Sequence, residues 1–177
     1  MKERADVLNN QAILFARDGQ YSDAIACLRR AIHIDRNNYL PWYNLGITYR
    51  DAGDMTEALK AFKIAFHISP SKEDVAETLA VHLMNMHMID EGFKVVEDGL
   101  DFHPASERLW NVMGVLQFNA DEYDLAADSF EMAVTIDPYY ADALYNLRDT
   151  YIELHKTRSA AIIEARLLEL EGKKKGK

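Results

Sequence analysis

The sequence repeats itself every 34 residues, and this period limits the possible folds more than any other feature. Written from Ala5, the chain divides into blocks 5–38, 39–72, 73–106, 107–140 and 141–174. Position 20 of the block is always small: Ala24, Ala58, Gly92, Ala126 and Ala160. Position 24 is large and apolar in all but the last block: Leu28, Phe62, Val96, Phe130, then Glu164. Such a period is typical of stacked repeats that bury their apolar faces against one another.

Each block predicts two amphipathic helices. Its apolar residues recur at positions 4, 7 and 11 and again at positions 20, 24 and 27, and each set lies on one face of a helix. Small residues let the two backbones approach, and the large ones fill the space beside them. Gly19 and Gly53 suit a helix stop that needs positive φ, and Pro70, Pro104 and Pro138 end the second helices. We therefore predict an all-α chain of helix pairs.

Composition places the chain among soluble globular proteins and excludes several function classes. Hydrophobic residues make up 49% and charged residues 28%, and the net charge of −9 disfavours broad binding to nucleic acid or anionic membranes. The single Cys27 cannot form an internal disulfide. Neither a signal peptide nor an apolar run of membrane-spanning length is present in the sequence. We expect no nucleic-acid partner, no membrane partner and a cytoplasmic location.

The block pattern resembles the tetratricopeptide repeat family. Block 39–72 carries the family signature at Trp42, Leu45, Gly46, Tyr49, Ala58, Phe62, Ala65 and Pro70. The resemblance implies a right-handed superhelical solenoid of antiparallel helix pairs with a C-terminal capping helix. Residues 1–174 would form a single solenoid of about four and a half to five repeats, the last one degenerate, followed by a basic tail at 175–177.

The last block departs from the pattern in its second half. We predict a terminal helix from Ser159 to Glu171 whose inward stripe is Ala160, Ile163, Leu167 and Leu170. Ile162 and Leu168 widen the apolar face beyond what one contact needs. Two interpretations stay open, a plain cap of the array and a contact for self-association.

The family resemblance also implies a function, which is a protein–protein interaction scaffold or adaptor. Its concave groove, lined by the first helices, would bind a peptide or an amphipathic helix. By this analogy, the groove residues are Asn9, Ile13, Leu40, Tyr43, Asn44, Ile47, Arg50, Glu77, Val81, Met84, Arg108, Asn111, Val115, Phe118, Asn119, Tyr145 and Asp149.

The residues of this groove suggest the chemistry of the ligand. Ile13, Ile47, Val81 and Val115 form an aliphatic ladder, unless tight curvature buries it between helices. The amides of Asn9, Asn44, Asn111 and Asn119 could hold a peptide backbone. Counted over block positions 2, 5, 9, 12 and 13, which would face the groove, seven acids stand against three bases. We therefore expect a protein or peptide ligand that is apolar with some basic character. Two alternatives are a homo-oligomeric assembly module, using the C-terminal helix or the groove, and a chaperone that holds an apolar client segment.

No motif points to catalysis, a cofactor or a metal. The chain has no phosphate loop, dinucleotide fingerprint or zinc spacing, so we predict that it is not an enzyme. Cys27 lies beside Leu28 on a packed helix and is expected to be a buried thiol rather than a nucleophile. The soft ligands between His82 and Met88 could bind Cu(I), but gap-filling methionines explain the segment better.

Overall fold

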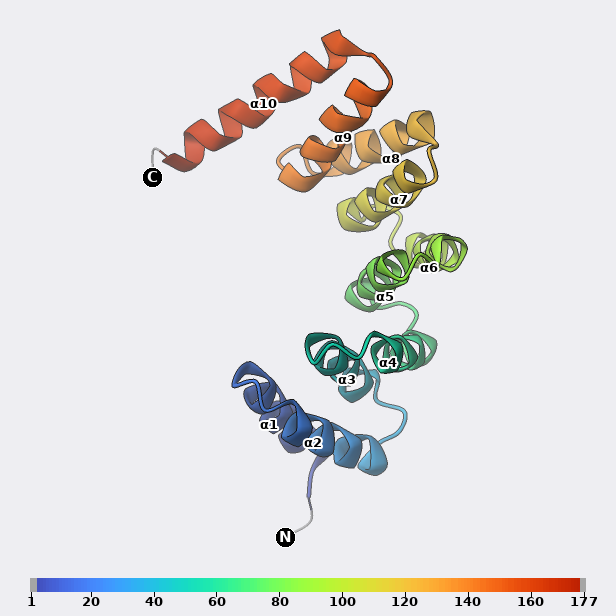
Figure 1. Ribbon diagram of the computed structural model, residues 1–177, viewed down its shortest axis with the longest axis vertical. Helices are drawn as coiled ribbons and strands as arrows, with labels where there is room; N and C mark the ends of the chain where they lie inside the picture. The colour runs from blue at the N-terminus through green and yellow to red at the C-terminus, as the bar shows by residue number, and fades with distance from the viewer. Residues whose placement is uncertain (1–2, 176–177) are drawn as a thin grey trace. The chain divides into compact units, whose positions relative to one another are not determined.

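The computed structural model describes residues 3–175, with side chains described as far as Gly172, and this part of the chain contains ten α-helices and no strand (Figure 1). The helices are α1 Ala5–Arg17, α2 Tyr21–Ile34, α3 Tyr39–Asp51, α4 Met55–Ile68, α5 Glu73–Asn85, α6 Ile89–Phe102, α7 Glu107–Asn119, α8 Tyr123–Ile136, α9 Ala141–Glu153 and α10 Thr157–Lys175. The first helix of every pair begins at the first residue of its 34-residue block. The predicted class, an all-α repeat of helix pairs, is confirmed.

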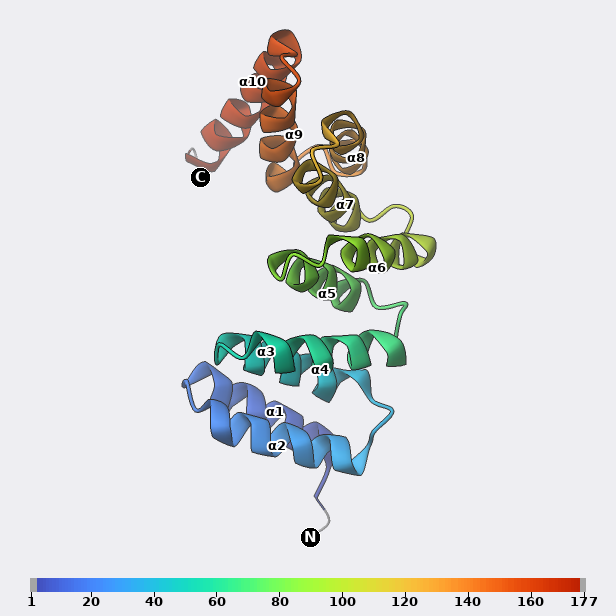
Figure 2. The same ribbon diagram turned by 45° about the vertical axis from the view of Figure 1, so that its right-hand side comes forward.

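The helices group into two compact units that divide between His82 and Leu83. In the first unit, α1 packs against α2, α3 against α4, and α2 against α3. In the second unit, α7 packs against α8, α8 against α9, and α9 against α10. Figure 2 shows the antiparallel pair α9 and α10 at the C-terminal end of the second unit. Each unit therefore repeats one packing arrangement, a helix pair stacked on the next pair.

The turn inside each pair depends on one residue with positive φ at position 15 of the block. Gly19 and Gly53 have φ of 73° and 87°, and His87, Asp121 and His155 have φ of 59°, 61° and 56°. Glycine adopts this region without strain, and Asp and His tolerate it better than most residues. The glycine stops predicted from the sequence are confirmed, and the same backbone conformation recurs in all five pairs.

Several helices begin with a side-chain cap. The side-chain oxygens of Asn38, Asp54 and Ser106 accept hydrogen bonds from the backbone N–H groups of Leu40, Glu57 and Leu109. A cap of this kind satisfies an N–H group that has no partner within the helix, and replacing it by alanine typically costs about 1 kcal/mol. These residues precede the helices directly, so they fix where α3, α4 and α7 start.

Within a pair, a glycine of the first helix makes room for a phenylalanine of the second. Phe62 and Phe130 are fully buried. A Cβ atom added at Gly46 would lie 2.5 Å from the ring of Phe62, and one added at Gly114 would lie 2.6 Å from the ring of Phe130. Glycine is required at these positions because any side chain would overlap the ring. The close helix approach predicted from the small residues is present in both units.

The last helix is longer than the Ser159–Glu171 segment expected from the sequence. It runs from Thr157 to Lys175, past Gly172, and therefore includes the first residue of the predicted tail. Residues 176 and 177 lie outside the described residues. Ala160, Ile163 and Leu167 are buried as expected, and Leu170 is half-buried. In contrast, the side chains of Ile162 and Leu168 are exposed, so the surplus apolar face is real.

Candidate functional site

In the first unit, the predicted ladder residues lie on first helices and keep part of their surface in solvent. Ile13 on α1 is exposed, and Ile47 on α3 and Val81 on α5 are half-buried. Tyr43 on α3 is also half-buried, and its hydroxyl forms a hydrogen bond with that of Thr78 on α5 over 3.0 Å. Burial by curvature, the alternative for the ladder, does not describe these three aliphatic side chains.

The remaining predicted residues of this unit differ in how accessible they are. Leu40 is exposed, and Glu77 is half-buried. Arg50 is exposed and bonded to its neighbour Asp51. An exposed ion pair of this kind contributes little to stability. These three residues hold block positions 2, 5 and 12, on either side of position 9, which the ladder residues hold.

Two of the predicted peptide-gripping amides are instead structural. Asn9 and Asn111 are buried, and their side-chain oxygens accept hydrogen bonds from Asn44 over 2.8 Å and Asn146 over 2.9 Å. Each bond joins the first helices of successive pairs, α1 to α3 and α7 to α9. Since a buried amide with its oxygen already bonded has little left to offer a ligand, we withdraw Asn9 and Asn111 from the ligand-contacting set.

Replacing Asn111 by alanine is therefore expected to affect stability rather than binding. The change leaves the Asn146 amide without its partner in a half-buried setting, so the free energy of unfolding should fall by about 1–2 kcal/mol. Urea denaturation followed by circular dichroism measures this loss. Asn119→Ala is the matched control, because Asn119 is exposed at the end of the same helix and its loss should stay within about 0.5 kcal/mol. Equal losses in the two variants would contradict the structural role.

The second unit contains a small apolar pocket between α7 and α9. Its volume is about 120 Å³, and it is lined by Val115, Phe118, Phe130, Asn146 and Asp149. Phe118 is held by an edge-to-face contact with Tyr123, at 5.0 Å between ring centroids. Sites for small molecules usually measure about 300 Å³ or more, so this pocket suits one side chain of a larger ligand. Three of its five lining residues, Val115, Phe118 and Asp149, are predicted groove residues.

Negative charge lies at the edge of this pocket. The guanidinium of Arg148 bonds Asp149 over 2.7 Å and Glu164 over 2.9 Å. The hydrogen bonds that Arg148 donates to Glu164 and Asp149 raise the pKa of its guanidinium above the ordinary value. Asp149 lines the pocket itself, whereas Arg148 and Glu164 line the neighbouring surface between α9 and α10. One positive charge between two carboxylates leaves a net negative charge there, which favours a basic group on a ligand.

Tyr145, Met84 and Arg108 are predicted groove residues of the second unit that do not line this pocket. Tyr145 donates a hydrogen bond to Glu171 over 2.8 Å, which raises the pKa of the Tyr145 hydroxyl and ties α9 to α10. Arg148 lies over the Tyr145 ring, 5.2 Å from its centroid. Met84 and Arg108 are half-buried on α5 and α7. The Tyr145 hydroxyl therefore ties α9 to α10, while its side chain stays partly exposed.

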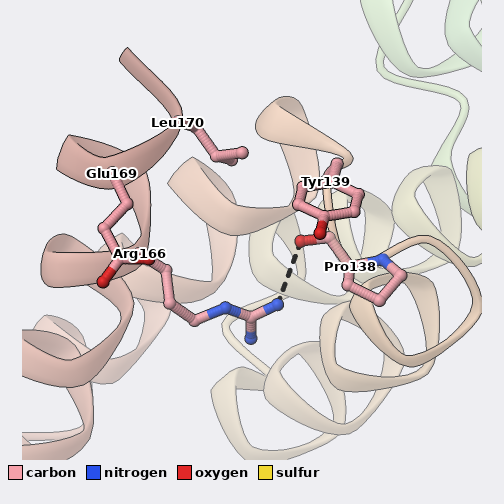
Figure 3. A pocket seen from close by; sticks show the side chains of 5 residues that line it. All are labelled: Pro138, Tyr139, Arg166, Glu169 and Leu170. Carbon is pink, nitrogen blue, oxygen red and sulfur yellow. Dashed lines mark hydrogen bonds between the residues drawn. The ribbon is translucent and has the colours of Figure 1, made fainter. Parts of the chain in front are cut away.

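Two further hollows lie along α10. One, an open depression of about 450 Å³ between α9 and α10, is lined partly by Asp149, Ile152 and Glu164. It shares Asp149 with the Val115 pocket, and Ile152 is exposed. The other measures about 220 Å³, and there Arg166 donates to the Pro138 carbonyl over 3.0 Å beside Tyr139 (Figure 3). The first hollow extends the apolar pocket along α9, whereas the second is separate from it.

The structure adds three residues to those named above for the groove. Asn146 and Phe130 line the pocket, and Ile152 lines the depression next to it. Phe130 was predicted only as a core residue, although its position in the block placed it beside α7. Asn146 could have been found from the polar residues that recur at position 6 of the block, namely Asn10, Asn44, Thr78 and Asn146, with Val112 as the exception.

The Cys27 thiol and the His82 imidazole, the two side chains considered for chemistry, lie buried among packed helices. Burial raises the pKa of the Cys27 thiol, and the negative charge of nearby Asp23 raises it further. A raised pKa disfavours the reactive thiolate. His82 packs against Phe62, and its Nε2 lies 2.9 Å from the Met55 carbonyl oxygen. Among the described residues, no group of three or more His, Cys, Asp or Glu side chains could hold a metal. Over the same residues, no helix is both long and apolar enough to cross a bilayer.

The fold and its exposed first-helix surface define the chain as a helical-repeat scaffold of the kind that mediates protein–protein interactions. Two family profiles match, "TPR repeat" over residues 14–51 and "Tetratricopeptide repeat" over residues 41–72. Tetratricopeptide repeats are therefore identified over residues 14–72, and the later helix pairs continue the same 34-residue block.

Known proteins show similarity over most of the chain. Transcription factor tau subunit sfc4 of Schizosaccharomyces pombe is 25% identical over 154 residues, which is 82% of this chain but only 15% of that relative. Among solved structures, MamA 41-end from Desulfovibrio magneticus RS-1 superposes with a TM-score of 0.83 at 20% identity, covering 98% of each chain. YrrB, described as a TPR protein with an unusual peptide-binding site, gives a TM-score of 0.73 at 19% identity over 93% of this chain and 85% of its own. These structural likenesses concern the fold.

Proposed function

We propose that this chain is a non-enzymatic adaptor that binds an apolar segment of another protein on its first helices, with the pocket of Val115 and Phe118 as the main contact. The observation that carries the proposal is this pocket, which is apolar, of side-chain size and bordered by excess negative charge. A side chain that enters it would exchange water for the faces of Val115, Phe118 and Phe130. The similarity in fold to YrrB, a protein with a peptide-binding site, supports a peptide as the class of ligand.

The ligand would combine an apolar anchor with a basic neighbour. Asp149 lies both in the pocket and in the depression that leads to Ile152, so a ligand could place a Lys or Arg beside Asp149 and a second apolar residue against Ile152. Asn146 donates its amide nitrogen to Asn111, which leaves its side-chain oxygen for a ligand N–H. An extended peptide and an amphipathic helix both fit this pattern.

A phage-displayed peptide library tests the proposal without a known partner. Peptides selected on the wild-type chain should share an aliphatic or aromatic residue close to Lys or Arg. Val115→Glu should weaken the binding of a selected peptide at least about tenfold, because it brings a charge into the apolar pocket. Asp149→Lys should weaken binding less and slow association, since charge at the rim acts mainly on the on-rate. Titration calorimetry and surface plasmon resonance give the two quantities.

The control for this experiment is Leu125→Glu. Leu125 is exposed on α8, outside the pocket, so the same change of chemistry there should leave peptide binding and helical circular dichroism unchanged. Full affinity in folded Val115→Glu protein would refute the proposed contact. Selected peptides that are acidic would refute the proposed ligand chemistry even if the pocket is used.

A further inference from the structure

The contact between successive helix pairs is built from the same block positions in both units. At the α8–α9 contact, Val134 belongs to one buried cluster with Ala143 and Leu147. At the α2–α3 contact, Ile32 holds the block position of Val134, and it is buried as well. The facing first helices bury position 10 of the block, with Thr48 at 3% and Thr150 at 0% exposure. Position 28 of α2 and α8 and positions 3 and 10 of α3 and α9 are therefore all buried where these pairs stack.

Each of these contacts also contains one side-chain hydrogen bond between the same two block positions. Arg29 of α2 donates to the hydroxyl of Tyr49 on α3 over 2.7 Å. At the equivalent positions of the second unit, the hydroxyl of Tyr151 on α9 donates to Glu131 on α8. Burial, followed by this bond to Glu131, raises the pKa of the Tyr151 hydroxyl. Position 25 of a second helix thus meets position 11 of the following first helix.

Helices α1 and α10 carry the two halves of this contact at exposed positions. Leu168 of α10 holds position 28, and it is 60% exposed where Ile32 and Val134 are 9% and 8% exposed. Val7 and Leu14 of α1 hold positions 3 and 10, and they are 55% and 59% exposed. The described residues thus include one uncovered second-helix face and one uncovered first-helix face.

The two exposed faces also match at positions 25 and 11, which form the polar bond in the internal contacts. Position 25 of α10 is Ala165, which is exposed, and position 11 of α1 is Phe15, which is half-buried. The other second helices carry a charged residue at position 25, namely Arg29, Lys63, Glu97 and Glu131. A charged side chain at position 25 of α10 would lose its hydration against Phe15 without gaining a partner, which costs free energy. Ala165 avoids this cost. Both end faces are apolar at the place where the internal contacts are polar.

We propose that the outer face of α10 docks on α1 of a second copy of this chain, with Leu168 and Ala165 against Val7, Leu14 and Phe15. The contact repeats between molecules the packing that joins α8 to α9 within one molecule. It is head-to-tail, because it joins two different surfaces, and it builds rings or open chains of copies. Gln11 stands between Val7 and Leu14 where the other first helices have Leu or Met, so the contact is weaker than the internal ones and reversible. The proposal does not depend on ligand binding, because Val115 and Phe118 take no part in it.

Sedimentation velocity of the full-length chain over a range of concentrations up to about 1 mM tests the contact, since a small interface of this kind needs high concentrations to associate. The wild type should show a weight-average sedimentation coefficient that rises with concentration. Leu14→Glu and Leu168→Glu should each weaken association at least about tenfold. An equimolar mixture of the two variants should form a dimer and nothing larger, because each variant keeps the half that the other lacks.

Met132→Glu provides the matched control, because Met132 is a similarly exposed apolar residue on α8 outside both end faces. It should associate like the wild type, and circular dichroism should show that all variants keep their helices. A wild type that stays monomeric throughout would overturn the proposal. So would wild-type association in either single variant, which would indicate a different surface, or a mixture of the folded variants that stays monomeric. None of these results bears on peptide binding at Val115.

Discussion

Phe130→Ala is expected to lower the free energy of unfolding by about 3–5 kcal/mol, the cost that removal of a buried aromatic ring generally carries. Phe130 is 1% exposed and belongs to the cluster that holds α7, α8 and α9 together, so its loss weakens one helix pair and the stacking of the next pair on it. Hydrogen exchange of backbone amides measures the effect locally, which matters because repeat arrays do not always unfold in one step.

The control for Phe130→Ala is the same substitution at Phe102. This residue ends α6 and is 52% exposed, so its truncation should cost less than about 1 kcal/mol. Protection in α7–α9 should fall in Phe130→Ala and stay near the wild-type level in Phe102→Ala. If both variants lose the same protection, Phe130 does not hold the second unit together.

The effect of Gly114→Ala on the free energy of unfolding is expected to change sign when Phe130 is replaced by alanine. In the wild type, the added methyl group would lie 2.6 Å from the Phe130 ring, and the overlap should destabilise the chain by about 2 kcal/mol after the gain in helix propensity is subtracted. In the Phe130→Ala background the ring is absent, and the same change should stabilise by up to about 1 kcal/mol. The coupling energy between the two sites is then about 3 kcal/mol.

A double-mutant cycle measured by urea denaturation gives this coupling energy. The four chains are the wild type, the two single variants and the double variant, and the helical content of each serves as a check of folding. Additive effects would show that the glycine is not there to admit the ring. Because Gly46 and Phe62 have the same geometry in the first unit, a second cycle at that pair should give a similar value.

The fold could be predicted from the sequence because the repeat specifies it five times over. The period predicted two helices in each block, and Gly19 and Gly53 marked turns that need positive φ, as the structure has them. The end of α10 could not be placed as well, since neither proline nor a turn residue with positive φ stops the helix at Glu171.

The candidate site was harder to predict, because helical periodicity gives the face of a residue but not what covers it. Asn9 and Asn111 share a helix face with exposed neighbours, yet both are buried. They accept hydrogen bonds from Asn44 and Asn146, which are 35 residues further along the chain. A single block does not contain that contact. The pocket at Val115 likewise needs Phe130 from α8 and Asn146 from α9, so it becomes visible only when three helices are packed together.

The position of a bound peptide on the second unit is the most direct test of the proposed function. Nuclear Overhauser effects between a selected peptide and the isotopically labelled methyl groups of the chain would locate it. The account predicts contacts from the apolar residue of the peptide to the methyl groups of Val115, and from the residues near its basic group to Ile152. Contacts to Leu125 on α8, without any to Val115, would contradict it.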